Sequence, residues 1–318
     1  MSEAFEKCVS GAAAGRPVGI ALFVEEGGGD WHARQLKAAM EARGAEVVIT
    51  TLKACAFDTR LPSGIDIPGF KDQLPDGAFV RSISTGSLEQ ITLRLGILHA
   101  LRESGVTVWN DARAIERCVD KSTATFFFQK AGLPVPVTRT AEGIESARRF
   151  LEDQAATCVG KPLFGSQGNG IRRIDTDADL PDPDDVGNVY YTQRYLRGRD
   201  VRRFEDWRVF VSRGRVLAAM ARVGDKWITN IHQGAGAEAV GIDDLKHNGL
   251  AGLALAAVQA IGVDYAGVDI IADDDGVLHV LEINSNPAWK GLQSVSDVNI
   301  AWTLAEDFLA ALRMPARP

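Results

Sequence analysis

The sequence lacks long apolar runs, clustered cysteines and an excess of basic residues. No stretch reaches the length of a membrane-spanning helix, and the segment before Arg16 has no apolar core of the kind that a secretory signal needs. The cysteines form no Cys-x-x-Cys pair, which is typical of reduced thiols in a cytoplasmic protein. They are Cys8, Cys55, Cys118 and Cys158. We therefore expect a cytoplasmic protein that does not enter a membrane.

Charge and composition narrow the choice of partners. The chain has 35 Lys and Arg residues against 42 Asp and Glu, a net charge of −7, which argues against a general nucleic-acid binder. A local basic site for an anionic ligand remains compatible with this balance. With 318 residues, 46% of them hydrophobic, the chain is long enough for two or three packed units.

The first part of the chain alternates between expected strands and helices. This order is typical of a doubly wound parallel sheet. The strands are expected at 18–24, 46–52, 78–82 and 106–109, and the helices at 31–43 and 88–104. Between the first strand and helix lies Gly27-Gly28-Gly29-Asp30. It could hold a phosphate, but it lacks the spacing of a dinucleotide-binding loop and Asp30 would repel an anion, so a plain turn is the favoured interpretation.

The rest of the chain predicts two further units. From about 111 to 190 we expect a small α+β unit, and beyond it a second group of strands with two long helices. In the small α+β unit we expect helices at 111–116, 121–131 and 144–154 and strands at 135–140, 156–163, 171–174 and 189–196. An acidic connection at 175–185 joins its last two strands. The last group has strands at 206–211 and 216–223, a loop at 230–241, helices at 245–261 and 298–312, and a hairpin between them.

The hairpin carries the strongest chemical signal. Asp275-Gly276 between two apolar runs predicts a two-residue turn. Counting outward places Asp269 opposite Glu282, and Asn284 on the same face. Two opposed carboxylates repel unless something compensates them, and Mg²⁺ with oxygen ligands is the simplest candidate. The alternative is a surface Asp269 with Glu282 paired to a lysine.

A lysine and a glycine-rich loop point to phosphate. Lys161 precedes the loop from Gly165 to Gly170, whose backbone N–H groups can approach phosphate oxygens. The loop is neither a Walker A sequence nor a dinucleotide-binding loop, and a plain β-hairpin is the alternative. Lys121 is the first residue of an expected helix, where the helix dipole does not stabilise a positive charge. This position therefore favours an anionic partner for the lysine. An ordinary exposed lysine explains this position equally well.

Two further groups of residues could complete a nucleotide site. The run Gln193 to Leu196 ends a strand, where backbone groups could contact an adenine edge or where the chain could simply hinge. Asp206 and Arg208 share a strand face, with Arg222 on the next strand and Asn230 and His232 in the loop beyond. An acid, two guanidinium groups and an amide could hold a ribose, phosphates and a carboxylate. Any one of them alone would be an ordinary surface residue.

The order of these parts resembles the ATP-grasp superfamily, and within it the RimK-like amino-acid ligases, whose Asn-x-His-x-Gly loop matches Asn230, His232 and Gly234. The resemblance covers nearly the whole chain. It implies an α/β and α+β fold of three parts. These are a pre-ATP-grasp α/β domain at 1–110, a central lid at 111–192 and a C-terminal metal-binding domain at 193–318.

The resemblance also implies roles for single residues. Phosphate contacts fall on Lys121, Lys161, Gly165, Ser166, Gly168 and Gly170. Adenine contacts fall on Gln193, Arg194, Tyr195 and Leu196, and the ribose contact falls on Asp206. Catalytic handling of phosphates and of an acyl phosphate falls on Arg208, Arg222 and Asn230, the last also being a nucleotide contact. The metal ligands fall on Asp269, Glu282 and Asn284.

Two positions depart from the family pattern. Arg194 stands where many members have an acidic residue, and because that contact is largely through backbone, ATP binding should survive. Ala288-Trp289-Lys290-Gly291 replaces the common Pro-Gly after the metal ligands, and this segment should border the acceptor substrate. Substrate identity therefore does not follow from any well-known member.

The expected function is an ADP-forming ligase that joins a carboxylate to an amine through an acyl phosphate. The resemblance implies ATP with two Mg²⁺ ions, with Mn²⁺ as a substitute, and glutamate as the amine substrate. The acceptor could be a protein tail, a peptide or a pterin or furan coenzyme of one-carbon metabolism. A non-catalytic nucleotide-binding regulatory protein is the alternative. Many relatives are dimers or tetramers, but no feature of the sequence decides whether this chain is a homo-oligomer.

Overall fold

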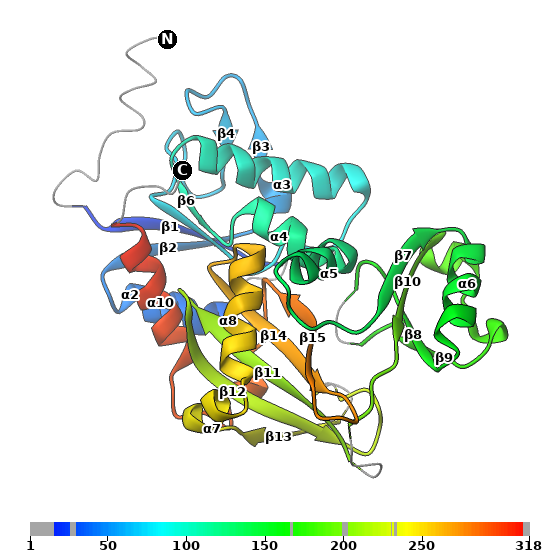
Figure 1. Ribbon diagram of the computed structural model, residues 1–318. Coiled ribbons are helices and arrows are strands. Elements are labelled where there is room, and N and C mark those ends of the chain that lie inside the picture. Colours follow the sequence, from blue (N-terminus) through cyan, green and yellow to red (C-terminus); the bar gives the residue numbers. More distant parts are fainter. Residues whose placement is uncertain are drawn as a thin grey trace. The chain divides into compact units, whose positions relative to one another are not determined.

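The computed structural model describes residues 16–25, 30–165, 168–198, 203–229, 231 and 234–313 (Figure 1). Within them the chain forms two compact units. Unit 1 holds the described residues up to 113 together with 288–290 and 298–313, and unit 2 holds those of 114–287 and 291–297. Residues 298–313 thus lie in unit 1, although the sequence analysis assigned them to the C-terminal domain. The boundaries at 110 and 192 stay a prediction.

Unit 1 is built on a four-stranded parallel sheet with the order β2-β1-β5-β6. The strands are β1 (Val18–Phe23), β2 (Ala45–Thr50), β5 (Gly77–Val80) and β6 (Thr107–Trp109). The helices are α2 (Trp31–Glu41), α3 (Leu88–Glu103) and α10 (Ile300–Ala311), and the short elements are η1 (Leu52–Ala54), β3 (Ala56–Phe57) and β4 (Ile65–Asp66). The predicted parallel α/β arrangement is confirmed.

The last helix belongs to the core of unit 1. The ring of Phe308 on α10 lies 5.3 Å from that of Phe79 and 5.7 Å from that of Trp109, and all three side chains are buried. The approach is so close that a Cβ at Gly77 would lie 2.6 Å from Leu312. A larger residue at Gly77 would have to displace the side chains of Leu312 and Phe308, so β5 packs closely against the C-terminal end of α10.

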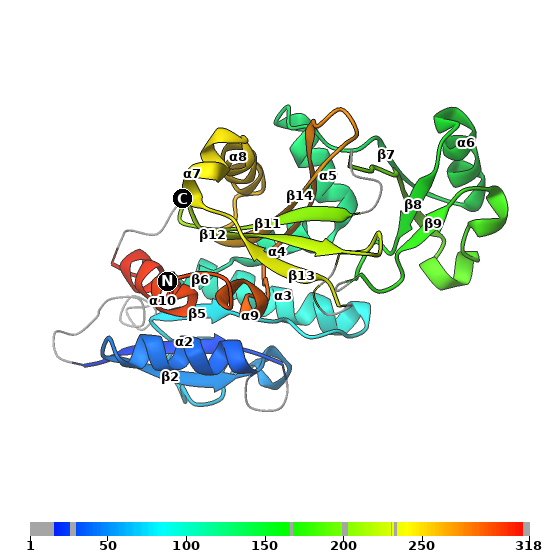
Figure 2. The ribbon, with the colours of Figure 1, turned by 90° about the horizontal axis from the view of Figure 1, so that it is seen from below.

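The first part of unit 2 is a small antiparallel sheet with the order β7-β10-β8-β9. Helix α6 packs against β7 and β10 (Figure 2). The strands are β7 (Thr138–Glu142), β8 (Cys158–Lys161), β9 (Arg172–Ile174) and β10 (Val189–Arg194). The helical elements are α4 (Ala112–Val119), α5 (Lys121–Lys130), α6 (Ile144–Gln154), η2 (Asp177–Asp179) and η3 (Pro183–Val186). Strand β7 begins later than predicted, because Pro136 has no N–H for the sheet.

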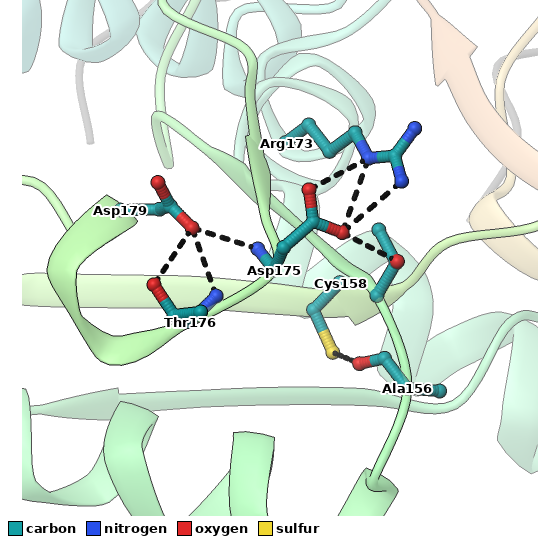
Figure 3. A network of polar contacts seen from close by, with 7 residues as sticks. Ala156, Cys158, Arg173, Asp175, Thr176 and Asp179 are labelled. Carbon is teal, nitrogen blue, oxygen red and sulfur yellow. Dashed lines mark hydrogen bonds and ion pairs between the residues drawn. The ribbon is translucent and has the colours of Figure 1, made fainter.

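The acidic connection after β9 is fixed to this sheet rather than loose (Figure 3). Asp175 accepts hydrogen bonds from Thr157 Oγ1 at 2.6 Å and from Arg173 Nε at 3.0 Å. Asp179 accepts from the backbone N–H groups of Asp175 and Thr176, at 3.0 and 2.8 Å. These contacts are exposed and so contribute little stability, but they determine the path of the chain from β9 into η2.

The second part of unit 2 is a five-stranded antiparallel sheet with the order β13-β12-β11-β14-β15. One face packs on α8 and α5, and its buried core includes Val209, Val268 and Ile270 (Figure 1). The strands are β11 (Phe204–Ser212), β12 (Arg215–Gly224), β13 (Gly236–Ala239), β14 (Tyr265–Ala272) and β15 (Leu278–Asn284). The helices are α7 (Ile242–His247), α8 (Leu250–Ile261) and α9 (Lys290–Gln293).

Two sequence expectations were wrong in this region. The single helix expected at 245–261 is broken into α7 and α8 at Gly249, which has a φ of +81° and ends the first helix. The loop expected at 230–241 includes the edge strand β13, which pairs with β12. Its sequence, Gly-Ala-Glu-Ala, has none of the β-branched or aromatic residues by which strands are usually identified.

The hairpin pairing is correct although the predicted turn was wrong. Residues 273–277 lie between the strands, so the loop has five residues where two were expected. Asp269 nevertheless pairs with Glu282, because a bulge between Ile270 and Asp269 adds Leu281 to β15 and restores the register. The bulge also lets Val280 and Ile283 both face the core while Glu282 faces away from it.

The structure also bears on the expectations about membrane-spanning helices and about the cysteines. No helix among the described residues is long and apolar enough to cross a membrane. Within the same residues the cysteines, Cys55, Cys118 and Cys158, are free and buried, as expected for reduced thiols. Burial raises the pKa of the Cys55 and Cys118 thiols to about 12, so neither is a reactive thiolate at neutral pH.

We expect opposite effects from the same substitution at two glycines. Gly249→Ala forces an L-residue into the left-handed region and should lower the free energy of unfolding of unit 2 by about 1 kcal/mol. Gly252→Ala, inside α8 with nothing within 4 Å of the new Cβ, should raise it by about 0.5–1 kcal/mol. Urea unfolding followed by circular dichroism measures both. Equal effects of the two substitutions would contradict the helix break at Gly249.

Candidate active site

A row of four paired charges crosses the face of the second sheet that points away from α8. Arg222 on β12 donates to both carboxylate oxygens of Asp206 on β11, its Nε lying 2.8 Å from Oδ1. Arg208 on β11 donates to Asp269 on β14 from Nε and Nη2, each at 2.6 Å. Arg222 also reaches Asp269 at 3.0 Å, so the two pairs form one network. The strand register produces it, because Asp206 is paired with Arg222 and Arg208 with Asp269.

The network keeps buried carboxylates charged. Asp206 is 4% exposed and Asp269 is 3% exposed. Burial by itself raises the pKa of Asp269, but Arg208 and Arg222 together hold that pKa well below its ordinary value. Burial also raises the pKa of Asp206, and the Arg222 guanidinium opposes this effect. A buried arginine, Arg222, and a largely covered one, Arg208, therefore face two buried carboxyl groups, an arrangement that is strongly destabilised when one member is removed.

Glu282 and Asn284 extend this face at the edge strand β15. Glu282 is paired directly with Asp269, and Asn284 Nδ2 lies 3.3 Å from Glu282 Oε1, so both side chains project from the same face. Two carboxylates and an amide give the hard oxygen donors that Mg²⁺ prefers. The donor set therefore fits this ion, although in the structure both oxygens of Asp269 accept from arginines. Among the described residues no three His, Cys, Asp or Glu side chains form a metal cluster.

Lys161 lies at the end of β8 and is held by a buried polar network. Its Nζ donates to Gln193 Oε1 at 2.9 Å, and Gln193 Nε2 donates in turn to Thr138 Oγ1 at 3.0 Å and to Tyr191 OH at 3.2 Å. Thr125 Oγ1 lies 3.0 Å from the same Tyr191 hydroxyl. Burial lowers the pKa of Lys161, and the nearby charge of Glu282 opposes this. A desolvated lysine near a carboxylate is a suitable partner for an anion.

Lys121 is the second cation of this part. It begins α5, whose N-terminus is capped by Asp120 through the N–H groups of Ser122 and Thr123. Lys121 Nζ donates to the backbone oxygen of Gly165 at 3.0 Å, at the start of the glycine loop. Burial lowers the pKa of Lys121, and the charge of Glu282 opposes this, as for Lys161. Both lysines are therefore near the same carboxylate.

The glycine loop is anchored at both ends. A Cβ at Gly170, where φ is +73°, would lie 2.7 Å from Pro162, so glycine is required there. Gly168 also has a positive φ, of +74°. Ser166, predicted to contact phosphate, lies outside the described residues, as does Asn230, predicted to be catalytic.

The expected adenine segment is partly used by the fold. The N–H of Arg194 donates to Val137 at 2.8 Å and that of Tyr195 to Thr157 at 3.0 Å, so these two donors belong to the sheet. The Gln193 side chain is engaged with Lys161. The prediction for the segment therefore narrows to its carbonyl oxygens and to Leu196. The Arg194 side chain is exposed, in keeping with a contact made through backbone.

Sequence reasoning missed the residues that support the two lysines. Tyr191 and Thr138 hold the amide of Gln193, and Asp120 fixes the first turn of α5. Alternating positions on β10 place Tyr191 and Gln193 on one face, and this was the available signal. Strand tyrosines are so commonly core residues that the alternation alone did not indicate a polar network.

Together, the fold and this array of charges define an ATP-grasp ligase, a class in which a nucleotide is held by two antiparallel α+β parts. The chain belongs to the RimK-like family of this class, because the RimK-like ATP-grasp domain matches residues 118–308. It is an ATP-dependent amino-acid ligase, and the family uses ATP and Mg²⁺.

Named relatives agree with this placement. The chain is 33% identical over 288 residues to a tetrahydromethanopterin:alpha-L-glutamate ligase of Methanococcus maripaludis, covering 88% of this chain and 94% of the relative. It is 35% identical over 249 residues to the ligase of the same name from Methanocaldococcus jannaschii, covering 76% and 81%. The ATP-grasp ligase PsnB, solved with a precursor variant, Mg and ADP, has a TM-score of 0.71 at 23% identity, covering 93% and 99%, and shows the shared fold.

We expect Arg222→Leu to lower the free energy of unfolding of unit 2 by about 3–5 kcal/mol, because it leaves the carboxylates of Asp206 and Asp269 buried without this partner. Urea unfolding at neutral pH measures the loss. Arg215→Leu is the matched control, since Arg215 is exposed on the same strand and its loss should change stability by less than about 0.5 kcal/mol. A loss at Arg222 no larger than the control's would show that the network is not a buried ion-pair system.

Proposed function

We propose that the chain joins the amino group of glutamate to a carboxylate acceptor, with ATP cleaved to ADP and phosphate. The observation that carries this proposal is the sheet face on which Arg208 is paired with Asp269, Arg222 with Asp206, and Asp269 with Glu282. The charge of Glu282 also acts on Lys121 and Lys161. Four cations facing three carboxylates suit a polyanion that brings its own divalent metal.

The nucleotide contacts follow from this arrangement. We assign the phosphates to Lys121, Lys161 and the backbone of the glycine loop at Gly165, Ser166, Gly168 and Gly170. The adenine edge is assigned to the carbonyl oxygens of Gln193 to Tyr195 and to Leu196. Asp206 is assigned to the ribose, with Asn230 as a further contact. Support for the lysines comes from their burial, which makes an anionic partner more favourable than in water.

The metal is assigned to Asp269, Glu282 and Asn284. Their oxygen atoms suit two Mg²⁺ ions, and Mn²⁺ accepts the same donors. When bound, such ions neutralise phosphate charge and orient the transferred group. The direct pairing of Asp269 with Glu282 supports this assignment, because it places two carboxylates side by side at the sheet edge.

The chemistry requires two steps and no protein nucleophile. A carboxylate oxygen of the acceptor attacks the γ-phosphorus, the bond to the β-phosphate oxygen breaks, and ADP leaves. The glutamate nitrogen then attacks the acyl carbon, the bond to the phosphate oxygen breaks, and the nitrogen loses a proton. We assign stabilisation of the phosphate charge in both steps to Arg208, Arg222 and Asn230, since guanidinium groups bind such oxygens in bidentate fashion.

The names of the relatives favour a pterin acceptor. The first two relatives above are named for addition of glutamate to tetrahydromethanopterin and are aligned along most of the chain. We therefore propose tetrahydromethanopterin or a similar pterin with a carboxylate as acceptor, ahead of a peptide. A reaction that consumes ATP and a free amino acid favours the cytoplasm as its place.

The test of this proposal is ADP release with Mg²⁺ and ATP across a panel of amino acids, each paired with a carboxylate acceptor. We expect release with glutamate and tetrahydromethanopterin together, and little with either alone. Glu282→Gln, which removes a proposed metal ligand, should reduce the rate by at least about 100-fold. Added hydroxylamine should trap a hydroxamate. Tight ATP binding without turnover for any pair would instead favour a regulatory protein.

A second test concerns the glycine loop and its lysine. Lys161→Ala should raise the Kd for ATP about 10- to 100-fold, since a hydrogen bond to a charged group is worth about 1.5–3 kcal/mol. Calorimetry with Mg²⁺ present measures the affinity. Lys130→Ala, at an exposed lysine on α5, is the control and should leave Kd unchanged. Equal affinities of all three proteins would mean that the loop is only a turn.

A further inference from the structure

Tyr195 continues β10 along the face of the small sheet that carries Lys161. Its backbone N–H donates to the carbonyl oxygen of Thr157 at 3.0 Å, so the pairing of β10 with the chain of β8 extends beyond the strand. Alternate side chains share a face, so the Tyr195 ring lies on the same side as the Gln193 amide, which holds Lys161 Nζ. Lys161 is paired with Tyr191, four residues before Tyr195, or about 13 Å along the strand. The ring therefore lies well along this face from the proposed phosphate contact.

The Tyr195 ring is packed against Arg173 of β9. The centre of the Arg173 guanidinium lies 5.5 Å from the ring centre. Arg173 is itself held by Asp175, which accepts from its Nε at 3.0 Å and from Thr157 Oγ1 at 2.6 Å (Figure 3). Thr157 thus contacts both the Tyr195 backbone and the carboxylate that fixes Arg173. Burial raises the pKa of Tyr195, so its ring keeps the hydroxyl proton and is neutral at physiological pH.

A second aromatic ring, that of Trp227, meets Tyr195 edge to face. The ring centres lie 5.9 Å apart and the ring planes are inclined at 77°, an arrangement favoured by the positive edge and negative face of aromatic rings. Trp227 lies in the loop 225–229, directly after β12 of the second sheet, and both rings are half-buried. The contact therefore joins the two sheets of unit 2 within the proposed adenine segment.

The same loop contacts the proposed ribose residue. The side chain of Thr229 donates a hydrogen bond to Asp206 which, like the Arg222 guanidinium, opposes the rise that burial causes in the pKa of Asp206. The loop thus contacts the adenine segment through Trp227 and Asp206 through a residue two positions later. A base and its ribose are covalently joined, so a nucleoside needs its two sets of contacts at neighbouring places.

We propose that Trp227 is a positioning residue for the adenine base, which holds Tyr195 and the adenine segment against the second sheet, so that loop 225–229 closes the nucleoside end of the ATP site. The inference rests on the proposed function. An aromatic pair at this point excludes water from the base, and hydrogen bonds from the base to backbone carbonyl oxygens are stronger where water is excluded. The proposed phosphate contacts lie elsewhere on the face, so the loss of Trp227 weakens the nucleoside contact.

The first test uses Trp227→Ala, which removes the ring that packs against Tyr195. Calorimetry with Mg²⁺ should show a rise in the Kd for ADP of about five- to tenfold. The KM for tetrahydromethanopterin at saturating ATP should change less than about twofold. Trp227→Phe, which keeps a ring on Tyr195, should bind ADP within about twofold of the wild-type protein.

Trp302→Ala is the control for this test, because Trp302 is an exposed tryptophan of unit 1 and its loss should change neither value. A folded Trp227→Ala protein with an unchanged Kd for ADP would overturn the proposal. An equal rise in the Kd for ADP and in the acceptor KM would overturn it as well, because it would show a general disturbance of the fold.

The second test separates positioning through Tyr195 from an independent contact of Trp227 with the base. Tyr195→Leu removes the other ring of the pair and should raise the Kd for ADP by a similar factor. Because both substitutions remove the same contact, the double variant should exceed the larger single effect by no more than about twofold. Single effects that multiply in the double variant would refute the positioning role.

Tryptophan fluorescence gives a readout that does not require a loss of affinity. Of the two tryptophans of unit 2, Trp207 packs against the core on the side of α8, whereas Trp227 lies at the proposed nucleoside end. Binding of ADP with Mg²⁺ should change the emission of the wild-type protein and of Trp207→Phe. It should change that of Trp227→Phe far less, although this variant binds ADP. An equal change in Trp227→Phe and in the wild-type protein would place Trp227 away from the nucleotide.

The two levels of the proposal fail separately. If the wild-type protein binds ADP but ligates no acceptor, the proposed function is wrong, and the calorimetry and fluorescence still decide the role of Trp227. If ligation occurs but Trp227→Ala binds ADP normally, the function stands and the positioning role of Trp227 is wrong. A wild-type protein that binds no adenine nucleotide would refute both.

Discussion

Four charges paired across three neighbouring strands are the constraint on which the rest of unit 2 depends. Each strand supplies a charge at the position opposite its partner, so the pairs form only in the observed register. A slip by one residue would turn each of these side chains towards the core side of the sheet. Since an unpaired buried charge is costly, the network favours the observed register in addition to the hydrophobic face. It also presents its charges on one face, where a charged ligand can meet them.

The sequence predicted this face better than it predicted the backbone that builds it. The alternation of Asp206 with Arg208, and the opposition of Asp269 to Glu282, follow from the period of a strand. The length of the turn could not be predicted in this way, because the Asp273 side chain stabilises a longer loop. Its Oδ1 accepts hydrogen bonds from the N–H groups of Asp275 and Val277. The longer loop and the bulge at Leu281 shift the register in opposite directions, so their effects cancel. Counting from the shorter predicted turn therefore still paired Asp269 with Glu282. A bulge has no sequence signal that could have been recognised beforehand.

Other errors have equally local causes. Gly249 interrupts an apolar period that reads as one helix, and only its positive φ shows that the chain stops and restarts there. The edge strand β13 is composed of residues with poor strand propensity and exists because β12 offers it a partner. The neighbours of the last helix could not be predicted, since its apolar face carries no information about which sheet it covers. Phe308 packs on Phe79 and Trp109, residues more than 190 positions earlier. Long-range choices of this kind are outside the reach of periodicity.

The two lysines show why the site favours an anion rather than merely tolerating one. Lys161 is desolvated, and the neutral oxygen of Gln193 compensates only part of the lost hydration. The charge of Glu282 adds to this compensation, but it acts on Lys121 as well. Lys121 and Lys161 donate hydrogen bonds to the neutral oxygens of Gly165 and Gln193, while the arginines of the sheet donate to the carboxylates of Asp206 and Asp269. Phosphate groups would supply the missing negative charge where it is needed. This difference between the lysines and the arginines supports the proposed assignment of the phosphate groups to Lys121 and Lys161.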